Sequence, residues 1–132
     1  MKYSEFKKLE KYTLKHKHAF LRVEHDLLGH NTWRGFFHDT DKLLLLYPAA
    51  LIMGRDKKWV QAHHRANNKH HVECKKERNR NDYIEMIIDW ECARFTKPDK
   101  PLDAYDTMQK FYPELQDVIL PLLREFKLNH NK

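Results

Sequence analysis

The chain has 132 residues and an ordinary composition, with 41% hydrophobic and 33% charged side chains, which is enough for one domain with its own core. Two cysteines without a CxxC pair, Cys74 and Cys92, exclude a disulfide scaffold and a cysteine-based zinc knuckle, and they favour a reducing cytosol. The net charge is +6, and the whole excess lies in residues 55–80, where nine Lys and Arg residues stand against three acids.

The predicted elements are all helical. Glycine and proline are scarce, at three and five residues, and no segment alternates as a strand would. The expected helices cover residues 4–28, 33–47, 56 onwards, 82–95, 101–112 and 113–128, with a short helical piece at 48–54, a loop at 74–82 and a linker at 96–101. We therefore expect an all-α, single-domain compact helical bundle of five to seven helices over residues 1–132.

Capping residues set the expected helix ends. Ser4 is placed to cap the first helix, and Asn31 or Thr32 the second. That second helix is expected to end before Pro48, and Gly54 to close the short piece that follows.

No segment predicts membrane contact. The longest apolar run, residues 43–53, is too short to span a bilayer, and residues 1–12 lack the apolar segment of a secretory signal. The protein is therefore expected in the cytoplasm, without a membrane partner. The basic segment attracts phosphate groups, although a solvated basic face accounts for its charge equally well. Four of the ten histidines in the chain lie among these charges. They favour a functional site over a merely solvated face, because histidine is the commonest metal ligand.

The sequence "FFHDTDK" pairs a histidine with an aspartate. Neighbours on a helix point about 100° apart, so His38 and Asp39 can both reach one ion beside it, and Lys42 follows one turn later on the side of Asp39. A surface ion pair of Asp39 with Lys42 or Arg34 explains an isolated pair of this kind equally simply.

Further candidate ligands lie on both sides of this pair. In "HHRANNKHH", His64, Asn68 and His71 share one helical face if the helix continues that far, and His63, Asn67 and His70 form the parallel register. Asp89, in the most apolar helix, needs a partner, and Glu85 shares its side. Upstream, His16 lies 22 residues before His38, which is far enough for it to sit on a preceding antiparallel helix. The alternatives to the chosen ligands are His18, His25, His63 and His70.

The order of these residues resembles the HD-domain superfamily of metal-dependent phosphohydrolases. The phrases "YTLKHK", "HDTDK", "HHRANNKHH" and "EMIIDW" are similar to a family from phages and Gram-positive bacteria with the forms H-D-x-S-K, H-x-x-x-N-x-H-H and E-M-x-x-D-W. The resemblance covers residues 12–90. Asp41 departs from it, where Ser is more usual, and the basic stretch 73–80 is shorter than the usual insert.

The resemblance implies an HD-domain-like fold and a phosphohydrolase with one or two divalent ions. One ion would be held by His16, His38, Asp39 and Asp89, and His64 and His71 would bind a second ion or the phosphate. Mixed imidazole and carboxylate ligands suit Mn, Fe, Co, Ni or Zn better than Mg. The expected catalytic residues are Asp39, Lys42 and Glu85, and the expected phosphate contacts are Lys42, Arg65, Asn68 and Lys69.

We expect a nucleotide as the substrate, because the predicted site is small and basic. Two alternatives stay open. A basic helical protein with Trp33, Trp59 and Tyr83 could bind nucleic acid through phosphates, with structural histidines. A degenerate HD fold could bind a nucleotide or a metal without turnover. The oligomeric state is not predicted, and a phage-encoded protein would act in the host cytoplasm.

Overall fold

The computed structural model describes residues 1–97, 99 and 102–130, and within these ranges the chain is helical, without strands. The all-α prediction is therefore confirmed. The helices are α1 (Tyr3–Leu28), α2 (Trp33–Phe37), the π-helical η1 (Lys42–Leu46), α3 (Tyr47–Met53), α4 (Lys57–Asn67), α5 (Arg80–Thr96), α6 (Ala104–Phe111), the 3-10 turn η2 (Pro113–Leu115) and α7 (Gln116–Glu125). None of the described helices is long and apolar enough to cross a membrane.

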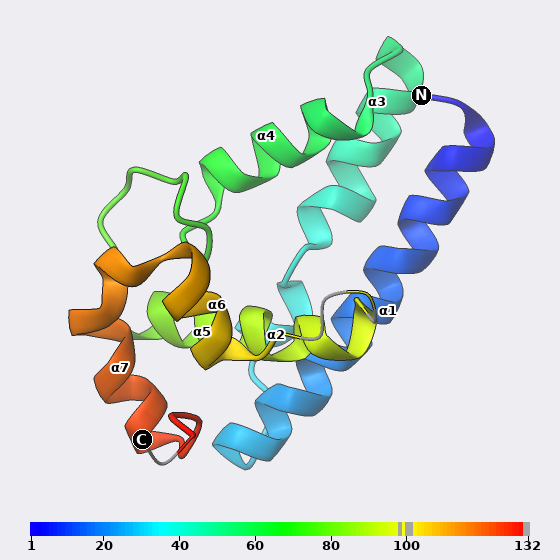
Figure 1. The fold of residues 1–132 in the computed structure, drawn as a ribbon. Helices are drawn as coiled ribbons and strands as arrows, with labels where there is room; N and C mark the ends of the chain where they lie inside the picture. Colours follow the sequence, from blue (N-terminus) through cyan, green and yellow to red (C-terminus); the bar gives the residue numbers. More distant parts are fainter. Residues whose placement is uncertain (98, 100–101, 131–132) are drawn as a thin grey trace.

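Helices α1 and α5 are the central pair of the fold, and they make the most extensive helix–helix contact. Figure 1 shows α3 and α4 on one side of this pair and α6 and α7 on the other. The side chains between α1 and α5 include Phe20, Val23, Ile88 and Cys92, all buried. This apolar contact fixes the two helices that carry His16 and Asp89.

Two more apolar clusters flank the central pair. One joins the first half of α1 to η1, α3 and α4, and the other joins α5 to α6 and α7. Their buried members are Phe6, Leu46, Tyr47, Ala50 and Val60 in the first, and Met86, Ile87, Ala104, Met108, Ile119, Leu122 and Leu123 in the second. Because each cluster buries one face of several short helices, the elements on both sides of the candidate site are held by packing rather than by helix propensity.

The prediction of one continuous helix over residues 33–47 is wrong. The chain leaves the helix at His38 and Asp39, and Asp39 adopts a left-handed backbone conformation with φ of 60°. Helical turns resume at Thr40 and continue to Met53 through the π-helical residues. Pro48 does not end them, and it lies in the first turn of α3, directly after the π-helical residues.

Helix α4 begins as predicted and ends earlier than a run through His71 requires. The Asp56 side chain caps it by accepting a hydrogen bond from the backbone N–H of Trp59. At its end, Asn68 is extended, and its side-chain amide donates to the His64 carbonyl at 2.7 Å. An amide that occupies a terminal carbonyl in this way stops the helix, and His71 therefore lies outside it.

The other ends differ in detail. Helix α1 begins at Tyr3 without a side-chain cap, so the Ser4 cap is wrong, whereas Gly54 closes α3 in the left-handed conformation as expected. Helix α5 begins two residues earlier than predicted, because Asn79 and Asp82 form a reciprocal capping box. Half of the predicted linker at 96–101, residues 98, 100 and 101, lies outside the described residues, and Thr96 belongs to α5.

Candidate metal centre

Four predicted ligands converge on one point. His16 comes from α1, His38 and Asp39 from the turn after α2, and Asp89 from α5, and ligand atoms of all four lie within 4.8 Å of one another. Oδ1 of Asp89 is 2.7 Å from Nε2 of His16 and 3.1 Å from Nε2 of His38. Oδ2 of Asp39 is 3.7 Å from Nε2 of His16. Residues up to 73 positions apart in sequence thus form one cluster.

His38 and Asp39 reach the cluster through a turn rather than along a helix. Both side chains are buried, at 2% and 5% exposure. The left-handed backbone of Asp39 reverses the chain between α2 and the next helical turn, which directs both side chains inward. Lys42 still lies near Asp39, with Nζ 3.9 Å from Oδ2.

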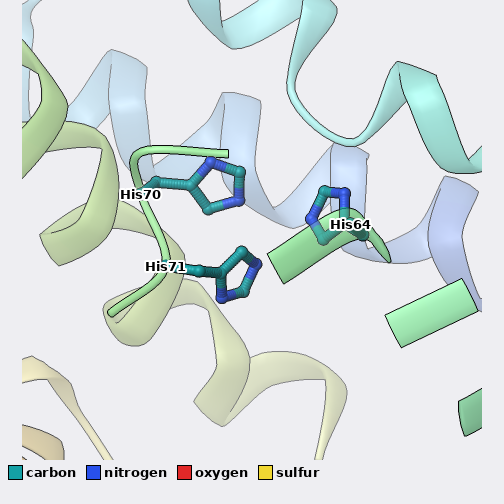
Figure 2. Close-up of side chains that lie close together, drawn as sticks. All are labelled: His64, His70 and His71. Atoms are coloured by element: carbon teal, nitrogen blue, oxygen red, sulfur yellow. The ribbon is translucent and has the colours of Figure 1, made fainter. Parts of the chain in front are cut away.

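A second cluster is formed by His64, His70 and His71, whose ligand atoms also lie within 4.8 Å of one another (Figure 2). His64 is on α4, and the other two lie in the loop that follows. Oδ1 of Asp39 is 2.9 Å from Nε2 of His64 and 3.6 Å from Nε2 of His70. Asp39 therefore lies between the two clusters and contacts both.

Three buried atoms at this junction have no hydrogen-bond partner among the described residues: Oδ1 of Asp39, Nε2 of His64 and Nε2 of His70. A buried polar atom without a partner is costly, and three at one point are unusual. Two imidazole nitrogens and a carboxylate oxygen are ligands that a divalent transition ion accepts. The residues at this junction therefore fit a metal ion.

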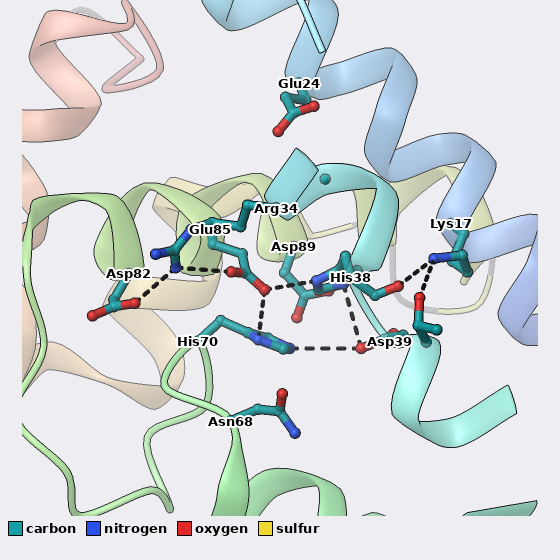
Figure 3. Close-up of polar contacts among 12 residues, drawn as sticks. Lys17, Glu24, Arg34, His38, Asp39, Asn68, His70, Asp82, Glu85 and Asp89 are labelled. Atoms are coloured by element: carbon teal, nitrogen blue, oxygen red, sulfur yellow. Dashed lines mark hydrogen bonds and ion pairs between the residues drawn. The ribbon is translucent and has the colours of Figure 1, made fainter. Parts of the chain in front are cut away.

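The opposite ring nitrogens of these histidines are held by carboxylates. Oε2 of Glu85 is 2.9 Å from Nδ1 of His38 and 2.7 Å from Nδ1 of His70 (Figure 3). Asp41 lies 2.8 Å from Nδ1 of His64. Because an ionised carboxylate only accepts, each Nδ1–H donates, which leaves each Nε2 directed at Asp39 or Asp89. A carboxylate behind each imidazole is the usual arrangement around a ligated metal.

A further shell of polar groups fixes these carboxylates. Arg34 donates to Glu85 at 3.1 Å and to Asp82 at 2.7 Å. The side-chain amide of Asn68 donates to Asp41 at 3.1 Å. Asn68 thus acts on the cluster through Asp41, a residue that we did not select from the sequence, although it stands two positions after Asp39.

The clustered charges shift the pKa values of the acids. Burial alone would raise the pKa of Asp39 and Asp89, but adjacent histidines outweigh it and hold both pKa values well below the usual range. The pKa of Glu85 is lowered in the same way by His38 and His70, against the effect of burial. All three carboxylates are therefore ionised at neutral pH, as metal ligation and its support require.

The histidines shift in opposite directions. Burial lowers the pKa of His38 and His70, but the adjacent carboxylates raise it, to about 10 and about 9. Burial and the neighbouring His70 lower the pKa of His71 to about 3. The metal-free cluster thus holds protons on two imidazoles where a cation would replace them, so metal uptake would release protons.

A cavity of about 470 Å³ opens above the cluster, and His16, Asp39, His64, His71 and Asp89 lie in its wall. Of the predicted phosphate contacts, Lys42 and Arg65 line it, whereas Asn68 and Lys69 do not. The cationic side chains in its wall are Lys42, Lys57, Arg65 and Lys97. Lys69 instead lies 4.0 Å from Asp82. Glu85 is also absent from the wall, behind the imidazoles.

Of the four alternative histidines, one joins the site. His70 is 4% exposed and contacts both Asp39 and Glu85, while His18, His25 and His63 are exposed. The sequence predicts His71 beside His64, because a helix that continued past Asn67 would place both on one face. The chain turns there instead, so both histidines reach the cluster.

The described side chains thus form His and Asp groups that could hold a metal ion. The wall of the cavity above them also contains Trp90 and Tyr112, whose rings stack at 5.2 Å between centroids and 7° between planes. No protein-family model, curated protein or solved structure matches the chain in comparisons with known proteins.

Proposed function

We propose that the protein is a metal-dependent phosphohydrolase that acts on a small phosphate ester, with a nucleotide as the favoured substrate class. The observation that carries the proposal is the position of Asp39, between two histidine clusters at the wall of a cavity that is also lined by four Lys and Arg side chains. The resemblance of the motifs to HD-domain phosphohydrolases agrees with it. The three buried atoms without hydrogen-bond partners add independent support for a cation at this point.

The residues divide into two ligand sets that share one carboxylate. His16, His38, Asp39 and Asp89 would hold one ion, and Asp39 with His64, His70 and His71 a second. A divalent ion of the Mn, Fe, Co, Ni or Zn type, when bound, lowers the pKa of a water and neutralises phosphoryl charge.

The chain's own residues orient the substrate. Lys42 and Arg65 lie in the cavity wall and can donate to phosphate oxygens, and Lys57 and Lys97 add positive charge. Glu85 keeps His38 and His70 oriented from behind and is a positioning residue.

A nucleotide suits both halves of the cavity. Its volume of about 470 Å³ lies within the range of small-molecule sites. The cations can bind phosphate, and the stacked Trp90 and Tyr112 offer an aromatic wall to a base. An aliphatic phosphate ester would contact the cationic side chains and leave the aromatic wall unused.

Nucleic-acid binding is the second candidate, and the contacts of the basic segment weaken it. Arg80 pairs with Glu125 at 2.5 Å, and Lys57 and Arg65 line the cavity. Among the aromatic residues proposed for such binding, Tyr83 packs against the apolar cluster of α5, α6 and α7. Tyr83 is thus engaged within the fold and Arg80 is paired, whereas Trp33 is 77% exposed.

Elemental analysis of the purified full chain, followed by a phosphatase screen with added Mn²⁺ and Co²⁺, tests the proposal. We expect at least one transition ion per chain and metal-dependent release of phosphate from nucleotides. His38→Ala should lose both, while His18→Ala, a change at an exposed histidine of α1, should lose neither. A metal-loaded but inert protein would support a degenerate fold, and a metal-free protein with salt-sensitive DNA binding would support the second candidate.

A further inference from the structure

Two non-helical segments carry candidate ligands, and in each of them a cationic side chain donates several hydrogen bonds to the backbone. The first is the turn with His38 and Asp39. Lys17, on α1, donates from Nζ to the carbonyl of Phe36 at 2.7 Å, to the carbonyl of His38 at 2.6 Å and to the hydroxyl of Thr40 at 3.1 Å. Figure 3 shows the contact of Lys17 with the His38 carbonyl. One ammonium group thus joins the end of α2, the turn and the start of the next helical segment.

The second segment is the loop with His70 and His71. The Arg78 guanidinium donates from Nε to the carbonyl of Lys69 at 2.7 Å. It also donates to the carbonyls of His71, at 2.5 Å, and Cys74, at 2.8 Å. These carbonyls bracket both histidines, so one side chain closes the loop around them.

The physical need for these contacts is clear in both segments. Carbonyls at a helix end and in a short loop often lack helical backbone partners, and a cation that contacts several of them supplies donors to all of them together. The His71 carbonyl also accepts from the backbone N–H of Cys74, at 3.2 Å. The left-handed backbone of Asp39 persists only where surrounding contacts impose it. An ammonium or guanidinium group supplies several donors from one side chain, which few other residues can do.

We infer that Lys17 and Arg78 are positioning residues of the metal centre, with Lys17 setting the turn that contains Asp39 and Arg78 setting the loop that contains His70. This inference rests on the proposed function for its consequence and on the contacts above for its mechanism. Neither residue touches an imidazole or carboxylate of the clusters in the contacts described. Both act through the backbone that carries the ligands.

Lys17→Met tests the first half, because it keeps an unbranched apolar stem and removes the ammonium. In the parent, the N–H of His38 donates to Gly35 at 3.3 Å and that of Lys42 to Asp39 at 3.1 Å. Hydrogen exchange of these two amides in metal-free protein should accelerate in the variant. Lys15→Met, at an exposed position of the same helix, is the matched control and should leave them unchanged.

Arg78→Gln tests the second half in the same way. The N–H groups of His71 and Cys74 donate to the carbonyls of Asn68, at 3.0 Å, and His71, at 3.2 Å, and their exchange should accelerate. Arg80→Gln is the matched control, because Arg80 binds the carboxylate of Glu125 rather than loop carbonyls.

Titration with Co²⁺, followed by its absorption spectrum, measures the consequence for the site. Each positioning variant should bind Co²⁺ roughly tenfold more weakly than the parent, the lower end of what lost support for ligands costs. Arg78→Gln should lose the second ion before the first. Lys17→Arg, which can donate to the same carbonyls, should recover affinity relative to Lys17→Met.

Accelerated exchange together with weaker Co²⁺ binding, absent in both controls, would support the inference. Parent-like exchange or parent-like Co²⁺ affinity in Lys17→Met and Arg78→Gln would overturn it. If Lys17→Arg binds Co²⁺ no more tightly than Lys17→Met, the proposed role of the Lys17 cation is overturned. If Lys17→Met does not fold, Lys17→Arg is compared with the parent instead, and a tenfold weaker Co²⁺ affinity would overturn that role. If the parent binds no Co²⁺, the proposed function fails, and the exchange comparison alone still decides whether these cations hold the two segments.

Discussion

Oδ1 of Asp39 lies 2.9 Å from Nε2 of His64, yet both atoms are buried without a hydrogen-bond partner in the described part of the chain. The same carboxylate faces His16 through its other oxygen, at 3.7 Å. One side chain therefore contacts both histidine clusters. Changes at Asp39 should affect both, whereas changes behind one cluster should affect that cluster more.

Asp39→Asn should abolish metal-dependent hydrolysis and reduce the number of bound ions, because an amide cannot serve two cations as a carboxylate does. The fold should survive, since none of the three apolar clusters includes this residue. Ion content and circular dichroism of the variant measure the two effects. Asp26→Asn, at an exposed position on α1, is the control, and hydrolysis at the parent rate by Asp39→Asn would remove the assignment.

Glu85→Gln should weaken metal binding roughly 10- to 100-fold, because one carboxylate oxygen accepts from both His38 and His70 and an amide supports them less well. Asp41→Asn should act more selectively on the second ion, through His64 alone. Competition with a chelator of known affinity separates the two. Equal losses at both ions in Asp41→Asn would contradict the division into two ligand sets.

The pH dependence of stability follows from His38 and His70, whose pKa values are raised to about 10 and about 9. A histidine with a raised pKa in the folded state contributes stability that is complete below its unfolded pKa of about 6.5 and is lost as the pH rises through its folded value. Metal-free protein should therefore unfold at lower urea concentration at pH 10 than at pH 6.5.

The same protons compete with metal, so apparent affinity for Co²⁺ should rise between pH 6 and 9.

The variant His70→Gln should show a smaller loss of metal-free stability across the alkaline range. Unfolding midpoints that are the same at both pH values would show that these imidazoles do not hold the protons assigned to them.

Arg65→Gln should raise the KM for a nucleotide about tenfold with little change in metal affinity, because a charge-assisted hydrogen bond to phosphate contributes about 1.5 kcal/mol. Lys69→Gln is the matched control, since Lys69 lies near Asp82 and outside the cavity wall. Steady-state kinetics on both variants measure the effect. A larger KM increase for Lys69→Gln would place the phosphate elsewhere.

Gly35→Ala should destabilise the protein by roughly 2 kcal/mol or more, because a Cβ at this position would overlap the buried carboxylate of Glu24. That carboxylate accepts from the backbone N–H and the hydroxyl of Thr32, so it cannot move without losing both bonds. Gly54→Ala, with open space around its Cβ and only backbone strain, should cost less in urea unfolding. The reverse order would show that α2 tolerates the side chain.

The helical fold could be predicted from local signals, and four of the candidate ligands selected from the sequence do lie together in the structure. Scarce glycine and proline indicate helices, and an acid such as Asp89 in an apolar helix needs a partner. His16 and Asp89 project from regular helices that pack against each other, which brings their side chains together as the predicted helices allow.

The parts that could not be predicted depend on backbone that leaves the helix. Nothing in "FFHDTDK" indicates that Asp39 is left-handed, because the cation that grips this turn, Lys17, belongs to another helix. The end of α4 at Asn67 likewise depends on the side-chain bond of Asn68 to His64, which brings His70 as well as His71 inward. Tertiary contacts, not local pattern, decide both.

The central claim is that a metal ion binds at Asp39, between the two histidine clusters. Anomalous diffraction from crystals of the full chain soaked in Co²⁺ tests it most directly. We predict a peak about 2 Å from Asp39 and from Nε2 of at least two of the surrounding histidines. Anomalous peaks confined to exposed residues such as His18, with none at Asp39, would contradict the account.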